Sequence, residues 1–252
     1  SQQERDHVVL EKDRVGESWR SKKWDSFTLV TPNRQMRLPG FEYQGDDPHG
    51  FMPREEVVEY LDDYVALFNP PLRLGVRATA VKGNGEDFTV ETDAGALEAD
   101  NVVVATGTFQ KPHIPAFSRR ISPQIVQRHS SLYRNPDHLP PGAVLVVGSA
   151  QSGCQIAEEL YQSGRRVYLC TGKAPRAPRT YRGHDFTWWL DKMGFLERTV
   201  DDLPSPAARF APNPAVTGAD GGHTLNLHRF PRDGVTLLGH MEGADGSKVV
   251  MA

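Results

Sequence analysis

The fold of this protein is decided by residues 144–153, which read VLVVGSAQSG. The four apolar residues at the start of this stretch predict a buried parallel strand. The small residues after them predict a tight turn into a helix. Apolar residues at helical spacing over 156–161 carry that helix to Gly164, which suits a left-handed cap. A second apolar run, 166–170, completes a strand–helix–strand unit.

The turn has the glycine spacing of a dinucleotide-binding loop. Gly148 permits the tight turn, and Gly153 permits close packing of the helix against the strand. The helix N-terminus would then receive a pyrophosphate. Ala150 stands where such loops usually carry a second glycine, and its methyl group could crowd the phosphate or be tolerated with a small shift. The alternative is a tight strand–helix turn that binds no ligand.

The residues after the second strand indicate which coenzyme fits. An NAD site offers an Asp or Glu there to hold the ribose hydroxyls. Residues 170–173 read CTGK instead and contain no acid. Lys173, Arg176 and Arg179 follow, and such cations suit the 2′-phosphate of NADPH. The alternative is an ordinary solvated basic loop.

The beginning of the chain resembles part of a second unit of the same kind. Residues 7–11 form a short apolar strand that ends in Glu11, an acid placed to hold a ribose without a phosphate. Only ten residues precede Glu11, whereas a strand, glycine loop and helix need roughly 30 in such a half unit. We therefore expect the phosphate-binding loop of this unit to be missing from the sequence.

Several elements between the two units have clear periodicity. Apolar residues at helical spacing predict an amphipathic helix over 53–69, which Pro53 can begin. Alternating patterns over 77–82, 88–92 and 96–100 predict a small antiparallel β-meander. The run at 102–105 predicts a buried strand.

Composition excludes several classes of protein. A net charge of −3 and a pI near 6.3 give no global basic field, so nucleic acid is not the expected partner. No apolar run reaches the ~18 residues of a membrane span, and no signal peptide is recognisable, so we expect a cytoplasmic protein. Cys154 and Cys170 form neither a redox pair nor a metal cluster, and are expected to be core thiols. No metal site is expected.

The order and spacing of several motifs resemble the flavin-containing monooxygenase superfamily, in particular a bacterial branch of NAD(P)-binding, FAD-dependent oxidoreductases. The motifs are Val8-Val9-Leu10-Glu11, Gly16-Glu17-Ser18-Trp19-Arg20, Trp24-Asp25-Ser26-Phe27, Thr31-Pro32-Asn33, Ala105-Thr106-Gly107-Thr108-Phe109, Pro112-His113-Ile114-Pro115, the segment 129–133 and the loop 148–153.

This resemblance implies an α/β fold with two Rossmann-like dinucleotide-binding domains, in which an NADP domain is inserted in an FAD domain. Residues 1–115 would form a partial FAD domain, 116–142 a connector, and 143–252 an NADP domain that is incomplete at its end. NADPH would reduce the FAD. O2 would then give a flavin hydroperoxide that oxygenates a small organic substrate.

The resemblance also assigns residues to the cofactors. Glu11 would hold the FAD ribose, Trp19, Trp24 and Asn33 would lie near the flavin, Thr106 and Gly107 would turn the chain close to FAD, and Gly148, Ser149, Gln151 and Ser152 would hold the NADP pyrophosphate. No catalytic residue is identified. Pro123 and Ile125 occupy the Phe and Gly places of the family's FxGxxxH signature before His129, which departs from a typical sulfur or nitrogen oxygenase.

Two other functions stay open. A flavin disulfide reductase shares the two-domain plan but needs a vicinal cysteine pair, which this sequence lacks. A catalytically inactive nucleotide-binding remnant, or a truncated fragment, would explain the missing first loop. The oligomeric state is not indicated.

Overall fold

The computed structural model describes residues 5–83, 85–107, 109–211 and 213–252. The chain divides into two compact units. The first combines Ser1–Lys22 with Glu55–His113, and the second combines Lys23–Arg54 with Ile114–Ala252. Among the described residues, no helix is both long enough and apolar enough to cross a membrane.

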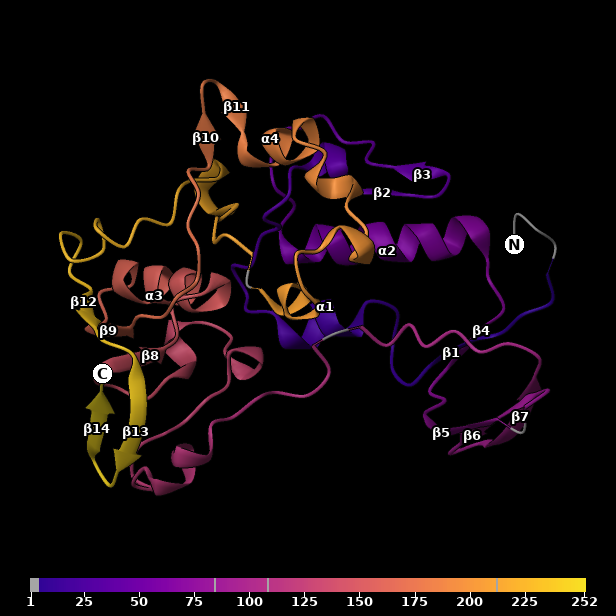
Figure 1. Ribbon diagram of the computed structural model, residues 1–252, viewed down its shortest axis with the longest axis horizontal. Coiled ribbons are helices and arrows are strands. Elements are labelled where there is room, and N and C mark those ends of the chain that lie inside the picture. The colour runs from indigo at the N-terminus through magenta and orange to yellow at the C-terminus, as the bar shows by residue number, and fades with distance from the viewer. Residues whose placement is uncertain (1–4, 84, 108, 212) are drawn as a thin grey trace. The chain divides into compact units, whose positions relative to one another are not determined.

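The second unit contains a parallel three-stranded sheet, drawn in Figure 1 with the order β12-β9-β8. Its strands are β8 (Val144–Val147), β9 (Val167–Cys170) and β12 (Thr236–Leu238). Helix α3 (Gln151–Gln162) connects β8 to β9 and contacts both. This strand order is that of one half of a dinucleotide-binding fold. The strand–helix–strand unit predicted from residues 144–170 is therefore confirmed.

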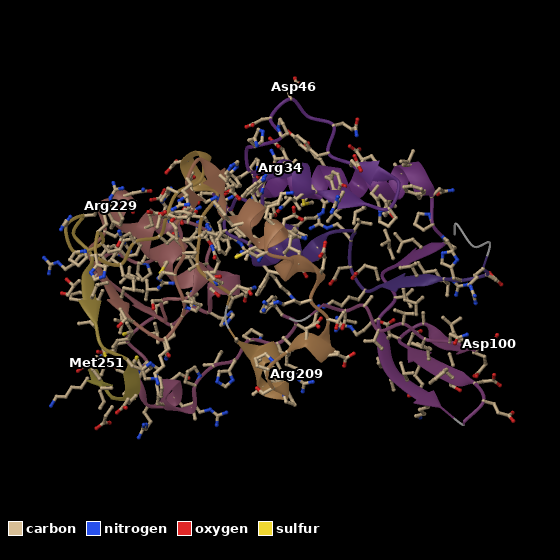
Figure 2. All side chains as sticks on the ribbon, turned by 45° about the horizontal axis from the view of Figure 1, so that its top comes forward. Arg34, Asp46, Asp100, Arg209, Arg229 and Met251 are labelled. Atoms are coloured by element: carbon tan, nitrogen blue, oxygen red, sulfur yellow. The ribbon has the colours of Figure 1, made fainter. Side chains whose placement is uncertain are left out.

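The core of this sheet continues onto an antiparallel hairpin of β13 (Met241–Asp245) and β14 (Lys248–Met251). Cys170 is buried against Met241 and Ala244, and the partly buried Met251, labelled in Figure 2, packs on the same cluster. Both cysteines are free and buried, as predicted for core thiols.

Short elements complete the second unit. The strands are β2 (Arg37–Leu38), β3 (Phe41–Glu42), β10 (Thr180–Tyr181) and β11 (His184–Asp185). The helix α4 spans Phe186–Lys192. The 3-10 turns are η1 (Asn33–Gln35), η2 (Ala116–Arg120), η3 (Ser130–Leu132), η4 (Pro136–His138), η5 (Phe195–Glu197), η6 (Val200–Asp202), η7 (Pro206–Phe210) and η8 (Ala219–Gly221). Helix α4 ends at Lys192, two residues before Gly194, which adopts a left-handed conformation with a φ of 66°.

The first unit contains a parallel pair and a meander. Strand β1 (Val9–Glu11) pairs with β4 (Leu72–Leu74). The antiparallel sheet is formed by β5 (Ala78–Gly83), β6 (Phe88–Thr92) and β7 (Gly95–Ala99), as predicted. The helices are α1 (Glu17–Lys22) and α2 (Arg54–Phe68), and the latter confirms the helix predicted over 53–69.

The strand predicted over 102–105 is wrong. These residues have no regular secondary structure, and Val103 and Val104 are 87% and 73% exposed. A β-strand exists only through the ladder hydrogen bonds of a neighbour, and no described residue pairs with this segment. Its apolar composition therefore could not by itself produce a buried strand.

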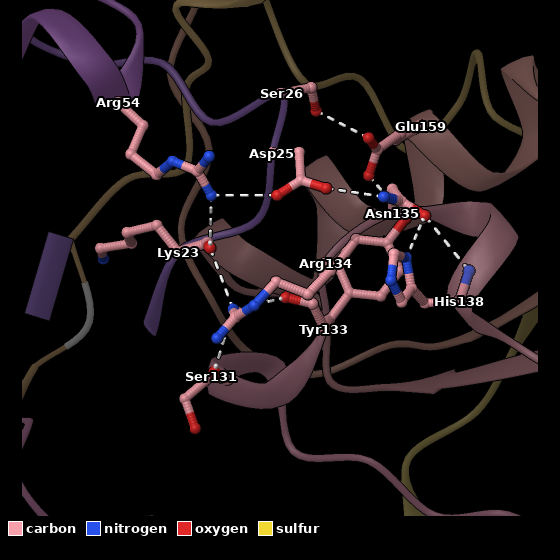
Figure 3. Close-up of polar contacts among 10 residues, drawn as sticks. All are labelled: Lys23, Asp25, Ser26, Arg54, Ser131, Tyr133, Arg134, Asn135, His138 and Glu159. Atoms are coloured by element: carbon pink, nitrogen blue, oxygen red, sulfur yellow. Dashed lines mark hydrogen bonds and ion pairs between the residues drawn. The ribbon is translucent and has the colours of Figure 1, made fainter. Parts of the chain in front are cut away.

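The compact units also divide the chain differently from the predicted boundaries, because the segment Lys23–Arg54 belongs with the second unit. Figure 3 shows the contacts that hold it. The backbone N–H of Asp25 donates to the Arg134 carbonyl at 2.8 Å, and its carboxylate accepts from Asn135 at 2.6 Å and from Arg54 at 3.0 Å.

A second set of contacts in Figure 3 ties the same segment to α3. The Ser26 hydroxyl donates to one carboxylate oxygen of Glu159 at 2.7 Å, and the Tyr133 hydroxyl donates to the other at 2.6 Å. Glu159 thus joins the segment, the turn at 130–133 and the sheet-covering helix. These residues lie more than 100 positions from Ser26, which is why periodicity along the chain could not show the grouping.

We predict that Asp25→Asn lowers the stability of the second unit by about 1 kcal/mol or less, the range of partly exposed ion pairs. Burial alone would raise the pKa of Asp25, but hydrogen bonds from Asn135 and Arg54 outweigh it and lower that pKa. Because the folded pKa of Asp25 lies below the unfolded value, its carboxylate stabilises the fold at neutral pH. The difference from wild type should shrink as pH falls below ~4 and through the lowered folded pKa. Thermal unfolding of both proteins at pH 7 and pH 3.5 measures this. Asp137→Asn, an exposed change on η4 two residues from Asn135, is the matched control, and an equal effect of both variants would refute the assignment.

Candidate coenzyme-binding site

The loop between β8 and α3 has open space at its first glycine. Gly148 has a φ of +99°, a left-handed conformation that favours glycine. A Cβ built on Gly148 would meet no atom within 4 Å. The requirement for glycine here is therefore the backbone conformation and not crowding by the protein.

The third glycine of the pattern is required for a different reason. A Cβ on Gly153 would lie 1.9 Å from the carbonyl oxygen of Gly148, a backbone atom that cannot move aside. Helix α3 therefore begins against the end of β8 at a separation that only glycine allows. This is the packing that a dinucleotide-binding loop needs if its helix is to point at a pyrophosphate.

Ala150 occupies the N-cap position of α3 in an extended conformation and supplies no side-chain cap. Caps normally satisfy one of the free N–H groups at a helix start. Without one, the first turn of α3 keeps its partial positive charge available to an anion. The departure from glycine at position 150 is thus compatible with the phosphate-binding geometry.

Ser149 fixes the loop from within. Its side chain is 1% exposed, and its hydroxyl accepts a hydrogen bond from the Gly172 N–H at 2.9 Å. Its carbonyl accepts from the Cys154 thiol at 3.2 Å and from the Arg176 guanidinium. Because burial raises the pKa of the Cys154 thiol to about 11, this thiol stays protonated and acts as a donor.

The structure places the three predicted cations differently from one another. Arg176 donates to the Ser149 carbonyl and contacts the Cys154 sulfur at 3.3 Å, so it lies behind the loop. Arg179 is only 3% exposed, whereas Lys173 is exposed. The sequence showed these charges but not the groups that engage them.

The partners of Arg179 account for its burial. Its guanidinium pairs with the Asp185 carboxylate at 2.8 Å, donates to the Val30 carbonyl at 2.6 Å, and lies 4.1 Å from the centre of the Phe51 ring. Burial lowers the pKa of Arg179, while Asp185 raises it again. Arg179 therefore joins three segments of the second unit.

A feature that the sequence did not reveal is a strap, residues 215–223, bound along one face of α3. Gln151 Oε1 accepts from the Val216 N–H at 3.1 Å, and Gln155 Nε2 donates to the Thr217 hydroxyl at 3.2 Å. One turn further, the His223 ring lies 2.8 Å from Glu158 Oε1. Positions 151, 155 and 158 share a helix face. Their polar side chains on a largely buried helix were the one sign in the sequence that another segment binds there. The Gln151 side chain is consequently held by the strap at the start of α3.

The residues expected to hold FAD fall into both units. In the first, Glu11 Oε1 accepts from the Asp13 N–H at 3.0 Å, and Trp19 lies half-buried on α1. Thr106 and Gly107 follow the irregular segment 102–105, and Gly107 has a left-handed φ of +76°.

Trp24 and Asn33 belong to the second unit and are buried. Trp24 packs edge-on against Phe27. The Asn33 amide donates to the Asp47 carbonyl at 3.0 Å and accepts from the Met52 N–H at 2.7 Å, so it closes the loop between them.

A parallel strand–helix–strand unit with a glycine loop between its first strand and its helix is the arrangement of a dinucleotide-binding domain. Residues 1–191 match the pyridine nucleotide-disulphide oxidoreductase family, and the chain belongs to this family.

Known relatives agree with this assignment. An uncharacterized oxidoreductase CzcO-like of Geobacillus kaustophilus is 41% identical over 190 residues, which cover 75% of this chain and 54% of that protein. A flavin-containing monooxygenase, FMO GS-OX-like 8 of Arabidopsis thaliana, is 29% identical over 170 residues, 60% of this chain and 37% of that protein. The predicted resemblance to flavin-containing monooxygenases is thereby confirmed. The chain spans about half the length of the first of these curated relatives.

A solved structure confirms the fold class. A mutant flavin monooxygenase of Stenotrophomonas maltophilia superposes with a TM-score of 0.70 at 20% identity, covering 97% of this chain and 73% of that one. The α/β architecture with dinucleotide-binding units is therefore shared over nearly the whole chain.

The contact between His223 of the strap and Glu158 of α3 predicts that the stability of the fold depends on pH. A hydrogen bond to Glu158 raises the pKa of His223, against the opposing effect of burial. Because the pKa of His223 is higher in the folded than in the unfolded protein, the ion pair stabilises the fold at pH values below the unfolded pKa of ~6.5. This contribution is lost as pH rises through the folded pKa. Glu158→Gln should therefore lower Tm at pH 6 by about 2–4 °C and lower it less at pH 9.

Differential scanning calorimetry at the two pH values measures the effect. Glu242→Gln, an exposed change in the same unit, should leave the pH dependence of Tm unaltered. If Glu158→Gln gave the same loss of Tm at both pH values, the His223–Glu158 pair would not be its cause.

Proposed function

We propose that the second unit binds NADPH and that the protein is an FAD-dependent NADPH oxidoreductase, most simply a monooxygenase that uses O2 on a small organic substrate. The observation that carries the proposal is the close contact of Gly153 with the Gly148 carbonyl at the start of a parallel strand–helix–strand unit. FMO GS-OX-like 8 is named as a flavin-containing monooxygenase, which supports the flavin and oxygen chemistry.

The residues around the loop fit an NADP coenzyme. The open space at Gly148 and the uncapped start of α3 would receive the pyrophosphate, with Ser152 and Gly153 in the first helical turn. NADPH supplies a hydride when bound. The chain itself supplies the positive helix terminus and a loop held rigid by Ser149 and Arg176.

The choice of NADPH over NADH rests on the end of β9. None of residues 171–173, which directly follow β9, is acidic. The exposed Lys173 is placed to pair with a 2′-phosphate. Arg176 and Arg179 were expected to share this role, but their bonds to Ser149, Asp185 and Val30 favour a different one. We propose that they support the loop and its surroundings, so that coenzyme discrimination falls mainly to Lys173.

Two variants separate these roles. Lys173→Ala should weaken NADPH about tenfold, the loss expected for one charge-assisted hydrogen bond, and leave NADH nearly unchanged. Arg176→Ala should weaken both coenzymes to a similar degree, because it releases the Ser149 carbonyl. Isothermal titration calorimetry with each coenzyme gives the four affinities, and Lys248→Ala, an exposed change on β14, is the control. Equal affinity of the unaltered protein for NADPH and NADH would exclude the proposed preference.

The first unit would contribute to FAD binding through Glu11, Trp19, Thr106 and Gly107, as the family resemblance implies. Its described residues include the parallel pair β1–β4 but no glycine-rich strand–helix turn. A flavin pyrophosphate normally rests on such a turn. Glu11 alone would provide a ribose contact without a phosphate site.

We therefore predict that the 252-residue polypeptide binds NADPH but retains FAD poorly and does not turn over. The visible spectrum of the polypeptide purified with added FAD, together with NADPH consumption, tests this directly. A stoichiometric yellow protein that oxidises NADPH would show that other residues hold the flavin. Adding a strand–GxGxxG–helix segment ahead of Ser1, with the remaining length that the relatives possess, should restore flavin. If flavin stayed absent from that longer chain, the inactive nucleotide-binding alternative would be favoured.

A further inference from the structure

A second candidate site lies in the second unit, on residues that the Gly148–Gly153 loop does not use. It is a cavity of about 300 Å³ between the β10–β11 hairpin, the start of α4 and the segment 34–49. This volume suits a small organic ligand. The cavity is lined by Arg34, His49, Gly183, His184, Asp185 and Trp188.

Arg34, labelled in Figure 2, provides a charge that the protein does not neutralise. Its guanidinium lies 2.7 Å from Nδ1 of His49. Arginine can only donate, so in this hydrogen bond Nδ1 of His49 accepts and the ring N–H lies on Nε2. Within the part of the chain that the structure describes, no carboxylate pairs with Arg34. The pair therefore offers the cavity a cation and an N–H donor.

The one acid in the lining is already engaged. Asp185 pairs with the buried Arg179 at 2.8 Å, and its other oxygen accepts from the Thr187 N–H at 2.8 Å. Its charge is thus compensated inside the protein. The cavity keeps the positive charge of Arg34, which attracts an anion.

Two further lining residues, His184 and Trp188, are aromatic, and Lys192 Nζ lies 5.9 Å from the centre of the Trp188 ring. The His184 and Trp188 rings stack at 3.8 Å between centroids with only 10° between their planes. Trp189 donates its indole N–H to the Tyr181 carbonyl at 3.0 Å, which fixes the hairpin against α4. A planar ligand can pack on such rings at little entropic cost.

We propose that this cavity binds a small planar organic acid. Arg34 and the Nε2–H of His49 hold its carboxylate, and Trp188 with His184 packs on its ring. A guanidinium recognises a carboxylate through parallel hydrogen bonds, which separates an acid from a neutral compound of the same shape. The inference is independent of the proposed oxidoreductase activity, because neither residue of the Arg34–His49 pair belongs to the coenzyme loop.

Benzoate is the probe, and benzyl alcohol is its neutral counterpart. Titration followed by the indole ¹H–¹⁵N signal of Trp188, assigned by Trp188→Phe, should show saturable binding of benzoate and little binding of benzyl alcohol. Arg34→Gln should weaken benzoate at least tenfold. Arg37→Gln, an exposed change on the adjacent strand β2, should leave binding unchanged. An unaltered spectrum of the remaining signals establishes that each variant is folded.

Three results would overturn the proposal. Benzoate could leave the Trp188 signal unmoved, benzyl alcohol could bind as well as benzoate, or Arg34→Gln could bind benzoate like the unaltered protein. The titration is repeated with saturating NADP⁺. Displacement of benzoate, together with a matching loss of NADP⁺ affinity in Arg34→Gln, would assign the cavity to the coenzyme instead. Failure of NADP⁺ binding alone would affect only the proposed oxidoreductase function.

Discussion

The close approach of Gly153 to the carbonyl oxygen of Gly148 is the constraint on which the coenzyme unit depends. It lets α3 start directly at the end of β8, so the helix covers the parallel sheet while its N-terminus opens beside the loop. A side chain at position 153 would clash with the Gly148 carbonyl oxygen and push the first turn of the helix away from the strand. Packing of Ile156 and Leu160 on the sheet, and the direction of the helix dipole, both follow from this one contact.

Two arginines, the partly buried Arg176 and the buried Arg179, organise the surroundings of that contact. Arg176 holds the Ser149 carbonyl, and Arg179 brings Asp185, the Val30 carbonyl and the Phe51 ring to one guanidinium. Removing a buried charge from a partner is costly because the remaining group stays desolvated. The segment Lys23–Arg54 is therefore an integral part of the second unit.

Local patterns predicted local structure well. The meander β5–β7, helix α2 and the unit 144–170 follow from periodicity and turn residues within a few positions. Features that depend on distant partners were missed. Val103 and Val104 read as a strand but pair with no described residue. The sequence also did not show that Asp185 and Val30 engage Arg179. The strap could not be predicted because the residues that bind the polar side chains at 151, 155 and 158 lie some 60 positions away in the sequence.

The strap is attached to α3 partly through main-chain atoms. Gln151 binds the backbone of Val216 at both its N–H and its carbonyl, and the backbone of Ala215 donates to the Pro175 carbonyl. These bonds therefore do not depend on the side chains at 215 and 216, which are buried and can be exchanged for other apolar groups of similar size. The length of the strap has no such freedom. One residue inserted between Thr217 and His223 would carry the imidazole past Glu158, so this stretch should tolerate substitution far better than insertion or deletion.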